Sequence, residues 1–365
     1  MRFVTGSPKG TWEPIITADT TTQSYWLNWR VLVCVIWVLL SAIFSSLIIL
    51  KYEVSWKATG NDNKEGQKET ATRNDDQKET SSTLYEDEIW RPCLKGIHPV
   101  WLLGFRIFAF VVLLVLLILT ATADGGSIFY FYTQWTFAAV TVYFGLGSLL
   151  SMHGCYQHLK KASGDKVGNV DGDAEQGISD APTTPQCSNP SNNDKGLGTP
   201  QEHLVRQPAG IWGYIFQIIF QIIAGAVMLT DCVFWFIIVP FLTIKDYHIN
   251  LLIISMHTIN AVFLIGDTAL NSLRFPWFRI GYFFMWTITY VIFQWIVHAI
   301  VKLWWPYPFL DLSSSYAPLW YTLFIFFYFS MALLHIPCYG IFALIMKLKH
   351  SVLSTRYPDS YLCVR

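Results

Sequence analysis

Charged residues are scarce in this 365-residue chain: they make up 14% of it, against about 25% in a typical soluble domain. Neither sign prevails, because 25 Lys and Arg residues balance 25 Asp and Glu residues. This balance excludes a nucleic-acid-binding protein that acts through a basic face, and we expect no nucleic-acid partner. The hydrophobic fraction of 53% excludes a disordered chain.

Metal-binding spacings are also missing. The seven cysteines form no Cys-x-x-Cys pair and no Cys/His zinc pattern, and no His-x-x-x-His helix occurs. Asn189 is followed by Pro190, so no Asn-x-Ser/Thr acceptor for glycosylation remains. We therefore predict neither a metal nor a cofactor.

What the chain does contain is a series of long apolar runs separated by charged segments. A helix that crosses a bilayer needs about 20 mostly apolar residues, and seven runs meet that length, so the sequence predicts an all-α, polytopic membrane bundle. The fourth run is longer than a straight crossing needs, and we expect it to be tilted or broken near Gly225. The predicted spans cover residues 31–50, 99–121, 127–152, 211–242, 249–270, 277–301 and 318–346.

This pattern divides the chain into tails, loops and groups of spans. Both long polar loops lack apolar periodicity, and we predict that they are disordered. The predicted division is a tail at 1–30, a first span at 31–50, a loop at 51–98, two spans within 99–152, a loop at 153–209, four spans within 210–346 and a tail at 347–365.

The distribution of positive charge predicts the orientation. Nineteen of the 25 Lys and Arg residues lie in or beside the connections after spans one, three and five, or in the C-terminal tail, and five lie on the other side. By the positive-inside rule, the C-terminal tail and both long loops face the cytosol, and the N-terminal tail faces the lumen or the exterior. We expect an integral protein of an endomembrane or the plasma membrane, with membrane lipids around it.

Ionisable residues inside spans are candidates for function because they are costly in a bilayer. We expect Arg106 to extend its side chain toward the cytosolic end of its span, and Asp267 to bind a neighbouring helix. The more informative set is Thr133, Asp231 and His257, which fall at comparable depths in the lumenal half, about 9, 16 and 12 Å in at the helical rise. If spans three, four and five are neighbours, a hydroxyl, a carboxylate and an imidazole converge there. These are the groups that nucleophilic catalysis needs: a nucleophile, a group that orients the base, and the base itself.

Three segments also resemble a known family. FYFYTQWT at 129–136, MHTINAVFLIGD at 256–267 and WPYPFLD at 305–311 look like the rolling-stone family of membrane proteins, and the polar inserts suggest a plant-type member. That family is similar to the androgen-induced family, several members of which are intramembrane threonine hydrolases that cleave fatty acid esters of hydroxy fatty acids. The resemblance implies that Thr133 is the nucleophile and His257 the general base. It covers about residues 99–346, and the first span lies outside it.

Three functions remain open. The first is a lipid-ester hydrolase that uses Thr133, His257 and Asp231 on an apolar ester, with Gln134 or Trp135 as the oxyanion donor and Thr136 as the fallback nucleophile. The second is a non-enzymatic scaffold, trafficking or fusion-related protein whose polar loops bind cytosolic proteins. The third is haem ligation by His257 and His298, for which His335 offers no second pair.

Overall fold

The computed structural model describes residues 19–54, 84–124, 126–168, 207–240, 251–307, 310–312 and 317–362. In these ranges the chain is helical, and its only extended pairings are three isolated bridges. This confirms the predicted all-α membrane bundle. The elements are α1 (Gln23–Trp26), α2 (Trp29–Ile49), η1 (Leu50–Val54), α5 (Glu86–Trp90), α6 (Pro99–Asp124), η3 (Gly126–Tyr130), α7 (Tyr132–Gly168), α8 (Ile211–Val233), η4 (Phe234–Ile238), α10 (Leu251–Met256), α11 (Ile259–Leu270), η5 (Trp277–Arg279), α12 (Ile280–Ile300) and α13 (Ala317–Arg356).

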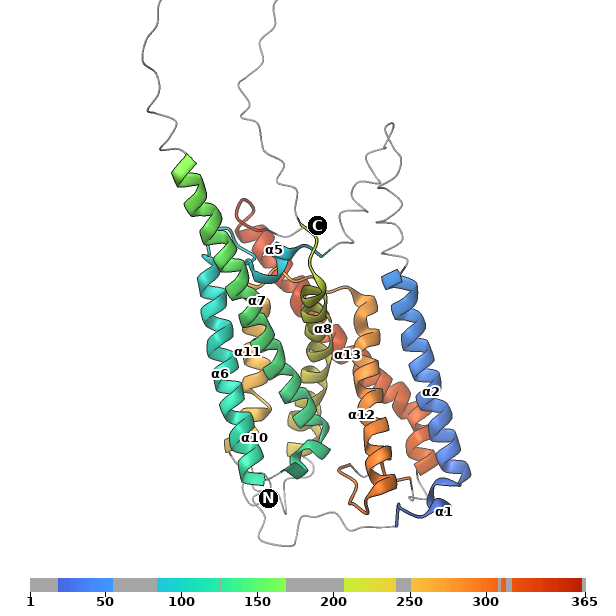
Figure 1. The fold of residues 1–365 in the computed structure, drawn as a ribbon. Helices are drawn as coiled ribbons and strands as arrows, with labels where there is room; N and C mark the ends of the chain where they lie inside the picture. The colour runs from blue at the N-terminus through green and yellow to red at the C-terminus, as the bar shows by residue number, and fades with distance from the viewer. Residues whose placement is uncertain are drawn as a thin grey trace, which may run out of the picture.

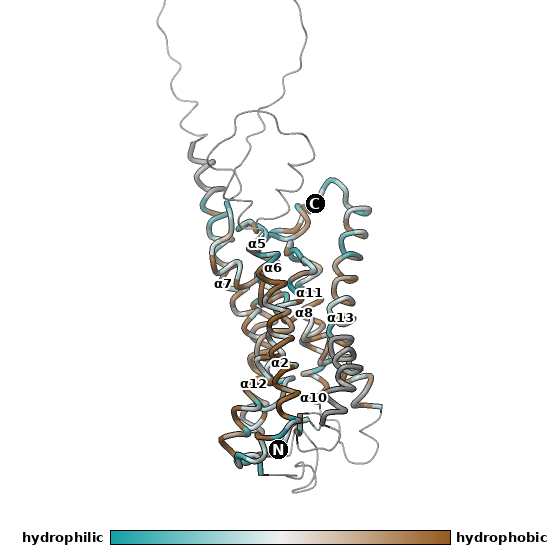
Figure 2. The backbone as a smooth tube through the Cα atoms, turned by 90° about the vertical axis from the view of Figure 1, so that its right-hand side faces the viewer, coloured by the Kyte–Doolittle hydropathy of each residue, from teal (hydrophilic) through white to brown (hydrophobic). Residues whose placement is uncertain are grey.

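Seven helical segments among the described residues are long and apolar enough to cross a membrane, so the protein is a multi-pass membrane protein. Figure 2 shows hydrophobic residues concentrated in the middle of the bundle and hydrophilic residues at its two ends. The seven segments are Trp29–Glu53, Pro99–Thr122, Tyr132–Lys160, Ile211–Phe236, Leu252–Leu270, Trp277–Ile300 and Leu334–Arg356.

Helix α8 lies at the centre and packs against α7, α12 and α13 (Figure 1). Its buried residues include Phe216, Phe220 and Ala224, and they belong to one large hydrophobic core. By contrast, α2 and α6 expose many large apolar side chains, as helices that face lipid do. The bundle therefore has a packed interior and an apolar exterior.

The helices alternate in direction, so the connections fall at two ends of the bundle (Figure 1). The C-terminal end of α2, helix α5, the C-terminal end of α7 and the C-terminal end of α13 lie together at one end, which we call the α5 end. Helix α1, η3 and α10 lie at the opposite end, which we call the α10 end. Both long polar segments are thus attached at the α5 end.

Helix α8 does not break near Gly225, which was one of the two alternatives that the length of the fourth span predicted. It is α-helical through Val233 and continues as the π-helical turn η4. Gly225 instead allows a close approach, because a Cβ atom built on it would lie 2.4 Å from Phe283 of α12. The glycine reflects helix packing and not a kink.

Part of the segment 51–98 is ordered, although its composition predicts disorder. Residues 84–98 are described, and they contain α5. Leu84, Ile89 and Trp90 are buried, and Glu88 forms an ion pair with Arg274 at 2.6 Å. These few apolar residues hold the end of the segment against the bundle. The sequence did not predict this because the segment is polar on average. Residues 55–83 of that segment, and residues 169–206 of the second, lie outside the described residues.

Candidate functional site

The predicted fifth span is interrupted at His257. Helix α10 ends at Met256 and α11 begins at Ile259, so His257 and Thr258 form a turn between them. A helix break inside a membrane leaves backbone groups that need partners. Trp235 of η4 supplies one, because its indole Nε1 donates a hydrogen bond of 3.0 Å to the carbonyl oxygen of His257. The turn η4, which continues α8, therefore stabilises the break.

The imidazole of His257 lies beside Asp231, near the end of α8. His257 Nδ1 and Asp231 Oδ1 are 3.3 Å apart, and both residues are buried. The ring also stacks on Phe234, with centroids 3.9 Å apart and an interplanar angle of 4°. The aromatic stack and the carboxylate together fix the position of the imidazole. The structure thus brings together two of the three predicted site residues.

Thr133, the third predicted site residue, is not hydrogen-bonded to this pair. It is the second residue of α7, because the five residues before Phe131 form the 3-10 turn η3. Next to it, Gln134 Nε2 donates to Met256 Sδ at 3.0 Å, which places the start of α7 against the end of α10. Within the described residues the Thr133 hydroxyl makes no hydrogen bond to His257. The predicted convergence of these two side chains therefore stays a prediction.

The other candidates on α7 have their own partners. The hydroxyl of Thr136, the fallback nucleophile, donates to the carbonyl oxygen of Tyr132 at 3.1 Å, as threonine in a helix commonly does. The indole nitrogen of Trp135 donates to the carbonyl oxygen of Phe129 at 2.8 Å. Gln134 is buried, and its Oε1 has no hydrogen-bond partner in the described part of the chain. Its amide nitrogen is therefore the only one of these donors that faces α10.

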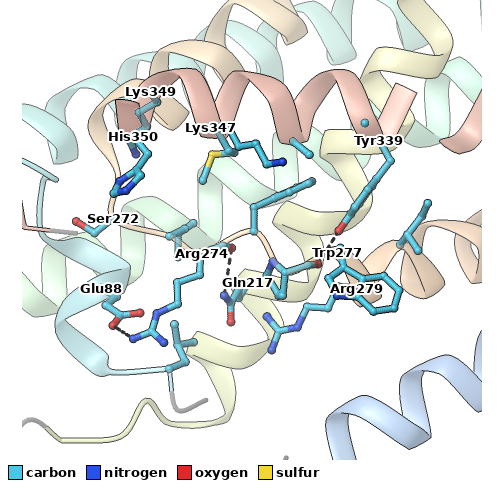
Figure 3. Close-up of a pocket in the computed structure, with 18 of the residues that line it drawn as sticks. Glu88, Gln217, Ser272, Arg274, Trp277, Arg279, Tyr339, Lys347, Lys349 and His350 are labelled. Atoms are coloured by element: carbon cyan, nitrogen blue, oxygen red, sulfur yellow. Dashed lines mark hydrogen bonds and ion pairs between the residues drawn. The ribbon is translucent and has the colours of Figure 1, made fainter. Parts of the chain in front are cut away.

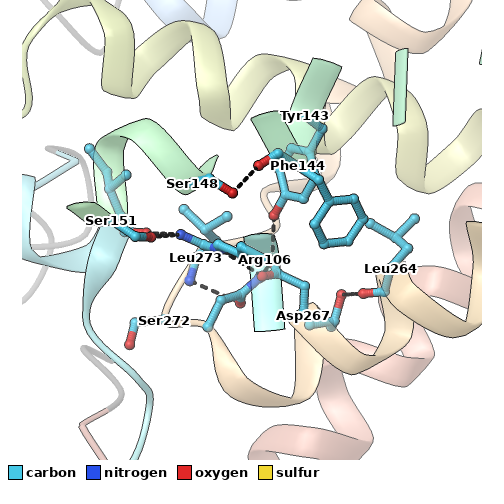
Figure 4. Close-up of polar contacts among 12 residues, drawn as sticks. Arg106, Tyr143, Phe144, Ser148, Ser151, Leu264, Asp267, Ser272 and Leu273 are labelled. Carbon is cyan, nitrogen blue, oxygen red and sulfur yellow. Dashed lines mark hydrogen bonds and ion pairs between the residues drawn. The ribbon is translucent and has the colours of Figure 1, made fainter. Parts of the chain in front are cut away.

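A second buried polar cluster lies nearer the α5 end, around Arg106 of α6 (Figure 4). Our expectation that Arg106 reaches the membrane surface was wrong. Its side chain has no exposure, and its Nε lies 2.7 Å from Oδ1 of Asp267 on α11, which is equally buried. Asp267 thus binds a neighbouring helix, as predicted. The other groups that complete the cluster are the carbonyl of Ile89, Ser151 Oγ, Tyr143 OH and Asn271 Nδ2, at 2.6–2.8 Å.

Aromatic rings enclose this ion pair. Phe216 of α8 stacks on Tyr143 with centroids 4.6 Å apart, and the Arg106 guanidinium carbon lies 5.0 Å from the centroid of Phe216. Gly147 leaves room for both, since a Cβ there would lie 2.9 Å from Phe216 and 3.4 Å from Arg106. The cluster joins α5, α6, α7 and α11, and its groups are engaged with one another. We interpret it as structural.

The remaining intramembrane histidines do not converge with His257. His298 has a backbone carbonyl oxygen near each ring nitrogen, that of Gln294 at 2.8 Å and that of Trp304 at 3.3 Å, and it stacks on Trp305. His335 Nε2 lies 2.9 Å from Thr287 Oγ1. This geometry does not favour haem ligation by His257 and His298. The described residues hold no group of three His, Cys, Asp or Glu side chains that could bind a metal.

Comparison with known proteins adds no further constraint on this site. No protein-family model, no curated protein and no solved structure matches the chain. The chemistry of the site therefore rests on its own residues, the pair Asp231 and His257 and the predicted nucleophile Thr133.

Proposed function

We propose that this membrane protein is an intramembrane lipid-ester hydrolase with Thr133 as nucleophile, His257 as general base and Asp231 as the group that orients the base. The observation that carries the proposal is the buried contact of 3.3 Å between His257 Nδ1 and Asp231 Oδ1 at a break in a membrane span. The resemblance of the segments around Thr133 and His257 to the rolling-stone family, and through it to threonine hydrolases, supports the same assignment.

The proposal assigns a role to each ring nitrogen. Nδ1 carries the proton and donates it to the Asp231 carboxylate, which lies 3.3 Å away, and Nε2 keeps the lone pair that a base requires. Thr133 must turn its hydroxyl toward Nε2 when a substrate is bound. Catalytic hydrogen bonds are often long or absent before substrate binds.

The proposed reaction has two steps. Thr133 Oγ attacks the ester carbonyl carbon while His257 takes the hydroxyl proton, and the alcohol leaves with that proton, so that an acyl-threonine remains. Water, deprotonated by His257, then attacks the acyl carbon, releases the fatty acid and returns the proton to Thr133. The Gln134 amide is the proposed oxyanion donor, because it already points toward α10.

Labelling with a fluorophosphonate probe tests the proposal. The purified wild-type chain should be labelled, and Thr133→Ala and His257→Ala should each abolish the labelling. Thr136→Ala is the matched control, because it removes a hydroxyl one turn away that bonds only to its own helix. Labelling that survives Thr133→Ala, or that is lost equally in Thr136→Ala, contradicts the assignment of the nucleophile.

A second function, a non-enzymatic membrane scaffold, is favoured by one observation. The bonds from Trp235 and Asp231 to His257 stabilise a helix break whether or not chemistry occurs there, and Thr133 is not bonded to His257. In that case the polar segments at the α5 end bind cytosolic proteins. A wild-type chain that folds but shows no probe labelling above that of Thr133→Ala supports this alternative.

A further inference from the structure

A large cavity lies at the α5 end, away from the proposed hydrolase site. Its volume is about 1020 Å³, at the upper end of the range for small-molecule sites. It lies between the second half of α2, the start of α8, the start of α12 and the second half of α13. None of Thr133, Asp231 and His257 lines it.

One part of the cavity is apolar and opens toward lipid. Phe44 of α2, Phe284 of α12 and Ile336 of α13 line this part. Phe44 is 62% exposed and Ile336 is 59% exposed, so the cavity reaches the surface between α2 and α13. The neighbouring outward residues on these two helices are also apolar and exposed: Leu40, Leu47, Ile341 and Leu344. The opening therefore faces acyl chains and not water.

The other part of the cavity is cationic. Lys347 and Lys349 come from α13 and lie opposite Arg274 and Arg279, which come from the segment before α12 (Figure 3). Among the described lining residues these four carry positive charge, and Glu88 is the one carboxylate. The cavity thus combines an apolar wall that opens sideways with an excess of positive charge.

Arg279 indicates what the cationic part receives. The residue is 5% exposed, and its Nε donates to Glu53 at 2.8 Å. Its Nη1 is buried and has no hydrogen-bond partner in the described part of the chain. A buried guanidinium N–H without an acceptor is costly, and the planar fork of arginine matches the oxygens of a phosphate group. An anionic oxygen in the cavity would satisfy it.

We propose that this cavity binds an anionic phospholipid from the leaflet at the α5 end. One acyl chain enters between α2 and α13 and packs against Phe44, Phe284 and Ile336. The phosphate accepts hydrogen bonds from Arg279 and ion-pairs with Lys347. A free phosphate would leave the apolar wall unfilled, and a lipid without a phosphate group would leave the buried Nη1 of Arg279 unsatisfied. A zwitterionic phospholipid would bring a cation to a cavity that already has an excess of positive charge. This site does not depend on the proposed hydrolase activity.

Lipid binding to the purified full-length chain tests the proposal by native mass spectrometry. The probes are phosphatidic acid and phosphatidylcholine with the same oleoyl chains, and glycerol 3-phosphate as a headgroup without chains. We expect phosphatidic acid to bind about tenfold more tightly than phosphatidylcholine, because its phosphate carries more negative charge and no choline ammonium that would be repelled by Lys347. Glycerol 3-phosphate should not compete. Equal binding of the two lipids, or full competition by glycerol 3-phosphate, overturns the proposal.

Two substitutions locate the site. Gly340 lines the cavity, and a Cβ built on it meets no atom within 4 Å, so Gly340→Phe should fill the space without disturbing α13 and should abolish selective binding. Gly104→Phe is the matched control, because Gly104 lies on another membrane helix and is equally unobstructed. Unchanged binding by Gly340→Phe, or equal loss in Gly104→Phe, overturns the assignment.

The charge is tested separately from the space. Lys347 is exposed, so Lys347→Gln should leave the fold intact and weaken phosphatidic acid binding by up to about fivefold, with little effect on phosphatidylcholine. Arg279→Gln should remove the selectivity. If the wild-type chain binds no lipid and a variant without residues 55–83 does, the chain's own polar segment fills the cavity and the proposal is wrong.

Discussion

Arg106 Nε and Asp267 Oδ1 lie 2.7 Å apart across helices α6 and α11, and neither side chain is exposed. Both charged groups have further hydrogen-bond partners. Tyr143 and Asn271 donate to the Asp267 carboxylate, and Ser151 accepts from the Arg106 guanidinium. A buried ion pair adds little net stability, but removing one member leaves the other charge uncompensated. The pair therefore specifies how α6 and α11 align more than it strengthens the bundle.

Replacing Arg106 with methionine should destabilise the protein by about 3–5 kcal/mol, because the Asp267 carboxylate would remain buried without its counter-ion. The measurement is the melting temperature of the detergent-purified chain. The double variant Arg106→Met with Asp267→Leu should melt above the single variant, because it removes both charges. A single variant that melts like the wild type would show that the carboxylate needs no partner.

The sequence predicts the seven spans well because membrane insertion depends on the average apolarity of about 20 residues, which composition records directly. The same averaging conceals α5, since Ile89 and Trp90 are outnumbered by the polar residues around them. A signal for the Arg106 pair was present: one opposite charge lies near the same end of each of two spans. The rotation of the two helices, which decides whether the charges meet, is fixed by packing and cannot be read from depth.

The depth of Thr133 in its span was estimated less well from the sequence. The predicted third span begins at residue 127, but η3 occupies residues 126–130, and α7 begins only at Tyr132. Thr133 therefore lies nearer the end of its span than predicted. The sequence around His257 contains no glycine or proline that would predict a helix break. The group that stabilises the break is the indole of Trp235, which comes from another helical segment. Such tertiary causes leave no local pattern.

Gly225→Leu should destabilise the bundle, because even a Cβ at this position would lie 2.4 Å from the ring of Phe283. Overpacking of this kind costs about 1–3 kcal/mol, which should appear as a lower melting temperature. Adding Phe283→Ala should restore part of the loss by removing the ring. Gly104→Leu serves as the control, because no atom lies within 4 Å of its Cβ position. Equal melting of the two glycine variants would argue against a close contact between α8 and α12.

We expect the α5 end to face the cytosol, because nineteen of the 25 Lys and Arg residues lie in or beside segments on that side. A tag placed after Arg365 should be digested by protease added to sealed microsomes, and a tag placed before Met1 should be protected. Detergent should expose both tags. Protection of the C-terminal tag in intact microsomes would reverse the orientation.

Asp231→Asn offers the sharpest separation of the two proposed functions, because asparagine has nearly the same shape as aspartate. If His257 is a general base, the asparagine amide would donate to Nδ1 and drive the imidazole proton to Nε2, the nitrogen that must accept the proton of Thr133. Fluorophosphonate labelling should then slow by about 10²–10⁴-fold, as for a base held in the wrong tautomer. The melting temperature should change little, since His257 keeps a hydrogen bond and its stack on Phe234.

Trp235→Phe should have the opposite pattern of effects. It removes the hydrogen bond to the His257 carbonyl, so the melting temperature should fall, while the labelling rate of the folded fraction should stay close to that of the wild type. If Asp231→Asn lowers stability and leaves the labelling rate unchanged, the pair is a helix contact without a catalytic role.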